Sequence, residues 1–134
     1  MKESRLTAQI MSYARKYGCF VVKWHMTAYG SGGMPDVYIL VPLEPYAIPV
    51  HIEVKTPGNT PTPRQSKVLR DLRKGGAVSF WTDAFSDVEY CIERLQAGYG
   101  VKVNNASGRL ERAREAYMPI CRECKIPRED GTSL

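Results

Sequence analysis

The spacing of hydrophobic positions changes twice in the first half of the chain, and each change predicts a new element. Over residues 3–17 apolar side chains recur every three or four positions, which predicts an amphipathic helix. Gly18 suits the left-handed position that follows many helices. Segments 19–24 and 37–41 are rich in β-branched and aromatic residues, so both are predicted to be strands.

Segment 48–55 predicts a further strand, with strict alternation from Val50 onward. Its last residues place apolar side chains on one face and polar side chains on the other: Val50, Ile52 and Val54 against His51, Glu53 and Lys55. The connection over 42–47 contains prolines and suits a hairpin. Antiparallel pairing would therefore bring Asp36 close to Glu53, although the two are far apart in sequence.

The second half predicts alternating helices and strands. Thr62 and Pro63 fit the first two positions of a helix that ends at Gly75-Gly76. The remaining predicted elements are a strand over 77–81, a helix over 85–96, a short strand or extended link over 101–103 and a charged helix over 109–117. We therefore expect an α/β fold of order α-β-β-β-α-β, with a small mixed sheet flanked by helices and a helical C-terminal extension. The expected division is a domain over 1–104 and, packed on it, an extension over 105–134.

Composition is ordinary for a globular protein, but charge is unevenly distributed. The 134 residues suffice for one domain with a core. No apolar stretch approaches the roughly 20 residues that span a membrane, and the N-terminus does not resemble a signal peptide, so we expect a cytoplasmic protein without a membrane partner. Net charge is +5, and residues 1–75 hold 11 Lys and Arg against 5 Asp and Glu. This surplus favours a phosphate-binding face, with ordinary solubility charge as the alternative.

Asp36, Glu53 and Lys55 are the strongest candidates for chemistry. Singly, each has an ordinary explanation: Asp36 as a residue that starts a strand, the other two as a solvated strand face. Together at one sheet edge, two carboxylates can hold Mg²⁺, and an ammonium can lie beside the same phosphate and the attacking water. The combination therefore favours metal-dependent hydrolysis of phosphodiesters.

These motifs and their order resemble the PD-(D/E)xK nuclease superfamily, and within it the VRR-NUC family. The matching residues are Gly-Met-Pro-Asp at 33–36, Ile-Glu-Val-Lys at 52–55 and Gln65, within a resemblance that covers roughly 3–83. The resemblance implies a restriction-endonuclease-like fold and a Mg²⁺ or Mn²⁺ ion held by Asp36, Glu53 and the backbone carbonyl of Val54. Stand-alone members are similar in organisation to Holliday-junction resolvases, which implies a homodimer that acts on branched DNA such as a four-way junction or a flap.

The resemblance also suggests three further site residues. Superfamily members often carry a glutamate on the first helix, for which Glu3 is the candidate and Gln9 a weaker one. The alternative for Glu3 is a carboxylate favoured near a helix N-terminus. Lys23 is the candidate for a phosphate contact, because the family often has a basic residue near this position. Gln65 would support the active site, although a Thr-x-x-Gln capping box explains it equally well.

Two other groups of residues carry weaker hypotheses. A basic stripe recurs at helical spacing and is either a DNA-backbone contact or a solvated face: Arg64, Lys67, Arg70 and Lys74. Cys121 and Cys124 form a CxxC pair, but a closed zinc site needs two more ligands. The other cysteines and histidines are scattered, so reduced thiols are favoured over zinc.

The favoured function is a divalent-metal-dependent DNA endonuclease. The alternative is a catalytically silent nucleic-acid-binding module of the same fold. A degenerate module would have little reason to keep Asp36, Glu53 and Lys55 together, so the sequence favours the enzyme. A small zinc-linked interaction protein is a third hypothesis that rests on the CxxC pair alone.

Overall fold

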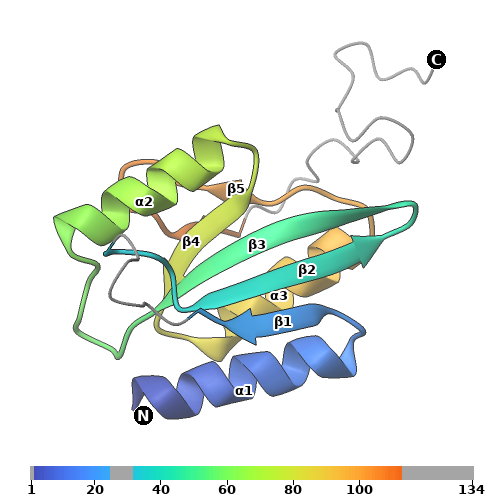
Figure 1. Ribbon diagram of the computed structural model, residues 1–134, viewed down its shortest axis with the longest axis horizontal. Helices are drawn as coiled ribbons and strands as arrows, with labels where there is room; N and C mark the ends of the chain where they lie inside the picture. Colours follow the sequence, from blue (N-terminus) through green and yellow to red (C-terminus); the bar gives the residue numbers. More distant parts are fainter. Residues whose placement is uncertain (1, 25–31, 113–134) are drawn as a thin grey trace.

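A four-stranded mixed sheet forms the centre of the protein (Figure 1). The computed structural model describes residues 2–24 and 32–112. In chain order the elements are α1 (Glu3–Lys16), β1 (Phe20–Lys23), β2 (Val37–Leu43), β3 (Tyr46–Val54), α2 (Pro63–Lys74), β4 (Val78–Thr82), α3 (Phe85–Gln96), β5 (Lys102–Val103) and β6 (Leu110–Glu111). This mixed α/β architecture and its order are those predicted from the sequence.

The strands lie in the order β1-β2-β3-β4, so neighbours along the chain are also neighbours in the sheet. The first three strands are antiparallel to one another, and β4 pairs parallel with β3 after the crossover through α2. The register places Val37 opposite both Lys23 and Ile52. The predicted hairpin between β2 and β3 is confirmed, with β3 beginning earlier than predicted, at Tyr46.

Helices cover the two faces of the sheet unequally. On one face α1 and α3 pack against β1, β2 and each other, and enclose the core. Its fully buried members come from every layer: Ile10 on α1, Ile39 on β2, Val50 and Ile52 on β3, and Ile92 on α3. On the other face α2 packs over β4 and the adjoining part of β3 (Figure 1). The active-site candidates lie on this second face.

Local sequence signals explain where the helices begin and end. Gly18 has a φ of +81°, the left-handed conformation predicted for the residue after α1. Thr62 and Gln65 form the predicted capping box at the start of α2, in which each side chain bonds the other residue's backbone N–H. Helix α3 matches its predicted bounds of 85–96. Its apolar stripe, which includes Val88 and Leu95, is buried.

The predicted helix over 109–117 is wrong where the structure describes it. Residues 110–111 form β6, which pairs antiparallel with β5 across a tight turn. Gly108 has a φ of +72° in that turn, and a Cβ there would meet the Trp81 ring at 3.1 Å. The alternating charges that suggested a helix belong to a hairpin packed beside β4, because tertiary contacts outweigh weak local propensity.

Some sequence hypotheses fall outside the described residues, among them Cys121, Cys124 and the rest of the segment beyond 112. Cys19 and Cys91 are buried free thiols. Within the described ranges, none of the helices has the length and apolar character needed to cross a membrane.

Candidate active site

Asp36 and Glu53 lie side by side at the end of two adjacent strands. Asp36 directly precedes β2, and Glu53 is the penultimate residue of β3. Because Val37 pairs with Ile52, the next row across the sheet brings Asp36 beside Glu53. The Asp36 Oδ2 accepts a hydrogen bond from the backbone N–H of Val54 at 2.9 Å. The predicted approach of the two carboxylates is therefore present in the fold.

Glu53 is almost fully buried, with 3% of its surface exposed. Its Oε1 accepts from the Gln65 amide at 3.0 Å and lies 3.5 Å from the Lys55 ammonium. Its Oε2 is buried and has no hydrogen-bond partner among the described residues. Burial, the larger cause, and the negative charge of Asp36 together raise the pKa of Glu53 to about 8, against the opposing effect of Lys55. A buried carboxylate oxygen without a partner is costly unless a cation or a proton compensates it.

These properties fit a divalent cation. Mg²⁺ takes six oxygen ligands and usually keeps several waters, so two carboxylates and one carbonyl are a sufficient protein contribution. The free Oε2 of Glu53 and the adjacent carboxylate of Asp36 would supply the two carboxylate ligands. Within the described residues, no set of three or more His, Cys, Asp or Glu side chains gathers there, so further ligands would be backbone or water oxygens.

Lys55 lies directly after β3 and is held beside Glu53. Its backbone N–H donates to the carbonyl of Thr82 at 2.9 Å, which fixes the chain where β3 leaves the sheet. Its side chain is 14% exposed, so the ammonium is largely shielded from water and its charge is weakly screened. A cation so placed can stabilise negative charge on a phosphate bound at the carboxylates.

Gln65 makes contacts that fit both roles left open by the sequence. Its Oε1 accepts from the Thr62 backbone N–H at 2.9 Å and so caps α2. Its Nε2 donates to Glu53 at 3.0 Å. The Thr62 N–H can only donate, so the oxygen of the amide faces Thr62 and the nitrogen faces Glu53. One side chain therefore fixes the start of α2 relative to β3 and orients the Glu53 carboxylate.

The glycines before Asp36 serve close packing and not only flexibility. Gly33 has a φ of +87°, and a Cβ at this position would lie 3.0 Å from Cγ of Arg64 and 3.2 Å from its backbone oxygen. Gly32 also contacts the Arg64 side chain closely. The segment is thus pressed against the first turn of α2, which holds Asp36 at the site.

Three of the sequence candidates are not brought to the carboxylates. Glu3 and Gln9 are exposed on α1. Glu3 does not complete a three-carboxylate group with Asp36 and Glu53. Lys23 is exposed at the edge of the sheet, and because it stands opposite Val37 its side chain starts on the α1 side, away from Glu53.

The predicted basic stripe is exposed along α2, at Arg64, Lys67, Arg70 and Lys74. Lys67 forms an ion pair with Asp71 at 2.8 Å, so part of its charge is already compensated. Arg70 and Lys74 border a depression that Arg73 and Asn105 also line.

Sequence reasoning missed several residues around the site. Lys2, Ser4 and Arg5 line an open depression together with Thr56, the residue after Lys55. Trp24 donates its backbone N–H to the carbonyl of Asp36 at 2.7 Å. The sequence carries no signal for the first group, because α1 reaches the loop after β3 only through tertiary packing.

Comparisons with known proteins agree with this geometry. No family model matches the chain, and no curated protein matches it significantly. A solved structure described as a VRR_NUC domain superposes with a TM-score of 0.57 at 27% sequence identity. The match covers 68% of this chain and 94% of that one. The VRR-NUC resemblance inferred from the motifs is confirmed, and it indicates a nuclease-type function.

Proposed function

We propose that this protein is a divalent-metal-dependent DNA endonuclease of the PD-(D/E)xK type. The observation that carries the proposal is the buried Glu53 oxygen without a partner, beside a second carboxylate and a shielded ammonium. A purely structural ion pair has no need of an unpaired carboxylate oxygen, since such a group destabilises the fold.

Each residue then has a separate task. Asp36, Glu53 and the backbone carbonyl of Val54 would hold Mg²⁺ or Mn²⁺, which when bound polarises the phosphate and lowers the pKa of a water. Lys55 orients the attacking water and neutralises the charge that develops on the phosphate. Gln65 keeps the Glu53 carboxylate in place through its hydrogen bond. The water oxygen forms a bond to phosphorus while one ester P–O bond breaks.

DNA is proposed to lie along the basic face that surrounds this site. One side of α2 carries four exposed cations: Arg64, Lys67, Arg70 and Lys74. The first turn of this helix lies next to the carboxylates, because Gln65 donates a hydrogen bond to Glu53. Lys23 would reach a phosphate only at the sheet edge. Contacts of this kind bind the backbone without regard to sequence and give an affinity that falls as salt concentration rises.

A structured substrate and a homodimer complete the proposal. The described residues hold one site per chain, whereas a four-way junction is resolved by two cuts in opposed strands. Two copies related by a two-fold axis would supply both cuts, and symmetric dimers are the commonest oligomers. A flap is the alternative branched substrate and needs a single cut.

A cleavage assay tests the function directly. Linear duplex, flap and four-way-junction DNA are incubated with Mg²⁺, Mn²⁺ or EDTA, with the wild type and Asp36→Ala compared. We expect cleavage by the wild type that requires metal and is absent in the variant. Tight binding without cleavage of any of these substrates would overturn the enzyme and favour a silent binding module.

A further inference from the structure

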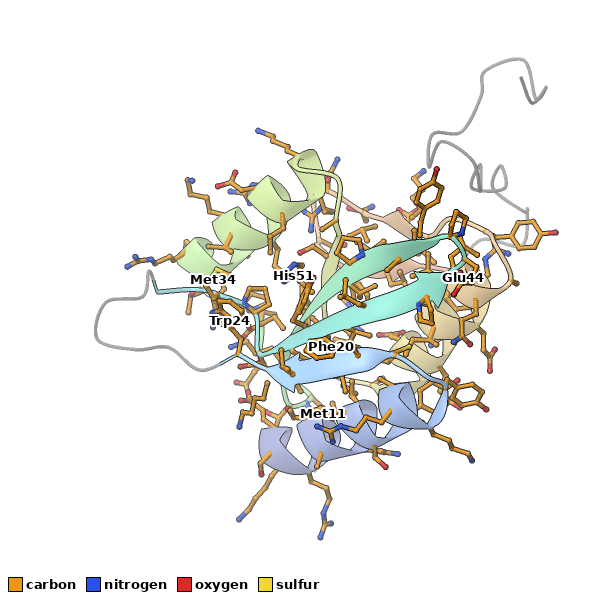
Figure 2. The ribbon with its side chains drawn as sticks, turned by 45° about the vertical axis from the view of Figure 1, so that its right-hand side comes forward. Met11, Phe20, Trp24, Met34, Glu44 and His51 are labelled. Atoms are coloured by element: carbon orange, nitrogen blue, oxygen red, sulfur yellow. The ribbon has the colours of Figure 1, made fainter. Side chains whose placement is uncertain are left out.

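An aromatic surface adjoins the site on the face of the sheet that α2 leaves partly open. Alternation along the strands places four rings on the same side as Asp36 and Glu53: Phe20, Trp24, Tyr38 and His51. Helix α2 packs over β4 and part of β3, whereas α1 and α3 lie on the opposite side. Figure 2 shows Phe20, Trp24 and His51 on this side of the sheet, beside α2 and not beneath it. We call these four residues the aromatic face.

The aromatic face is exposed to solvent to a degree unusual for large apolar side chains. Phe20 is 59% exposed and Trp24 is 47% exposed. Tyr38 and His51 stand opposite each other across β2 and β3 with ring centroids 4.8 Å apart. Tyr38 and His51 are half-buried between the two exposed rings and the candidate site.

Trp24 connects this surface to the catalytic row. Its backbone bond to Asp36 continues the antiparallel ladder, so Trp24, Asp36 and Glu53 form one row across three strands. Neighbouring strands lie about 4.8 Å apart, which puts Trp24 roughly 10 Å from Glu53. Successive nucleotides can cover that distance within about one to three steps along a strand. A base on Trp24 would therefore belong to the same strand as a phosphate bound at the carboxylates.

Charge around the aromatic face suits an anionic ligand. The carboxylates in this row are Glu53 on β3 and Asp36 directly before β2, and both belong to the candidate metal site. Lys55 and Arg64 lie at the border of the face nearest the site. Aromatic rings next to cations, without competing carboxylates on the strands, are the features by which proteins hold single-stranded nucleic acid.

We propose that the aromatic face binds unpaired nucleotides of the DNA substrate by base stacking, with Trp24 holding the base next to the phosphate that is cut. The inference rests on the proposed function, because it takes DNA as the ligand, and it narrows the substrate to DNA with a single-stranded segment at the cleavage point. Every nucleobase has a π-face, so this recognition selects unpaired structure and not sequence.

A second copy of the chain is the other ligand that an apolar face could take. Against it, a copy seated on Trp24 would lie across the approach to Asp36 in the same row. Each copy also carries a net charge of +5. Electrostatic repulsion therefore opposes a contact in which Lys55 and Arg64 of one copy are buried against the same residues of a second copy. The bases of single-stranded DNA avoid both problems, because the DNA is the substrate of the same site and carries negative charge.

The test compares binding of two hairpin duplexes, one blunt and one with a single-stranded thymidine arm. All proteins carry Asp36→Ala so that the DNA is not cut. Fluorescence anisotropy at two salt concentrations measures the DNA affinity of this parent protein and of three further variants: Trp24→Leu, Trp24→Phe and Tyr17→Leu. Tyr17 is the matched control, since it is 43% exposed at the end of α1 and lies outside the aromatic face. Thermal unfolding checks that every variant is folded.

We expect Trp24→Leu to weaken binding of the armed duplex about tenfold and to leave the blunt duplex nearly unchanged. Trp24→Phe should restore most of the loss, and Tyr17→Leu should behave as its parent. Tryptophan emission should be quenched by the armed duplex only when Trp24 is present. Equal affinity of Trp24→Leu and its parent for the armed duplex, or an equal loss on both duplexes, would overturn the inference.

Two further outcomes separate this inference from the proposed function. A protein that holds the arm through Trp24 but, with Asp36 restored, cuts nothing would retain the inference and lose the nuclease. Metal-dependent cleavage with equal affinity for the armed and the blunt duplex would retain the nuclease and overturn the inference. Sedimentation that shows a dimer lost on Trp24→Leu would assign the aromatic face to a second copy and overturn the inference.

Discussion

Two clusters of acidic and basic side chains lie at opposite borders of β4, and they differ in how completely their charges are compensated. The first is the catalytic cluster of Asp36, Glu53 and Lys55. The second, which we call the arginine cluster, joins α3 to the β5–β6 hairpin through Asp83, Asp87, Arg109 and Arg112. Similar residue types therefore serve two purposes within one small domain.

In the arginine cluster the carboxylates are paired. Asp87 accepts from Arg112 at 2.9 Å and from the Thr82 hydroxyl at 2.6 Å, and Asp83 accepts from Arg109 at 2.9 Å. The guanidinium of Arg109 also lies 4.3 Å from the centre of the Trp81 ring. These contacts fasten the hairpin to the body of the protein. Within the described residues, neither Asp83 nor Asp87 has a buried oxygen that lacks a partner.

In the catalytic cluster the Lys55 ammonium pairs with Glu53 at 3.5 Å, and the other oxygen of Glu53 has no partner in the described structure. Its pKa is raised to about 8 because burial and Asp36 both oppose the charged form. Perturbed carboxylates of this kind are characteristic of functional sites. The comparison teaches that incomplete compensation, and not the presence of charge, distinguishes a candidate site from a structural ion pair.

The largest expected effect is on cleavage by Lys55→Ala. Loss of the shielded ammonium should lower the cleavage rate by about 100-fold or more, because the ammonium stabilises the negative charge that develops on the phosphate in the transition state. DNA affinity and thermal stability should stay near those of the wild type. Single-turnover cleavage and calorimetry check both. Lys55→Arg should not restore the rate, since a planar guanidinium cannot replace a compact ammonium, and full activity of either variant would contradict the role given to Lys55.

The next effect is a pH dependence of stability that arises from Glu53 in the catalytic cluster. In metal-free protein Glu53 keeps its proton up to a pKa of about 8, whereas the unfolded chain loses it near 4.5. The folded state binds more protons in this window, so its stability falls as pH rises, by about 3 kcal/mol between pH 4.5 and 7. Glu53→Gln should abolish that fall, and Asp36→Asn should reduce it.

Denaturant unfolding in EDTA across this range measures the effect. The difference in unfolding free energy between Glu53→Gln and the wild type should grow with pH. Parallel pH profiles for the two proteins would show that Glu53 is compensated as fully as the acids of the arginine cluster.

A smaller effect on cleavage is expected from Gln65, and two variants distinguish its hydrogen bond to Thr62 from its hydrogen bond to Glu53. Gln65→Leu removes both the cap of α2 and the bond to Glu53, so cleavage should fall about tenfold. Thr62→Ala removes a capping partner without touching Glu53 and should cost about 1 kcal/mol of unfolding free energy. Its cleavage rate per folded molecule should match the wild type. If both variants lost activity equally, Gln65 would act only through the helix cap.

The smallest effect is expected in the arginine cluster. Arg109→Ala should lower the unfolding free energy by about 1 kcal/mol, since partly exposed ion pairs and a cation–π contact contribute little each. Cleavage should be unchanged once the folded fraction is accounted for. A double-mutant cycle with Asp83→Ala gives the pair energy. Loss of activity at full stability would extend the active site to this cluster.

Much of this architecture followed from short-range sequence signals. Amphipathic spacing predicted α1 and α3, and the Thr-x-x-Gln box predicted the start of α2, because each depends on residues close together in the chain. The hairpin β2–β3 followed from alternation and from the connection between the strands. The helix expected over 109–117 failed because β6 depends on contacts with β5 and β4 that lie outside its own segment.

The sequence by itself determined which side chains form the candidate site, because a strand of period two fixes that Glu53 and Lys55 share a face and hairpin pairing brings Asp36 to them. Only the tertiary structure decided that Glu53 is buried with an oxygen unpaired, that Gln65 spans from the cap of α2 to Glu53, and that Trp24 lies in the catalytic row. The physical reason is that desolvation and unmet hydrogen bonds depend on everything packed around a group, which no local pattern records.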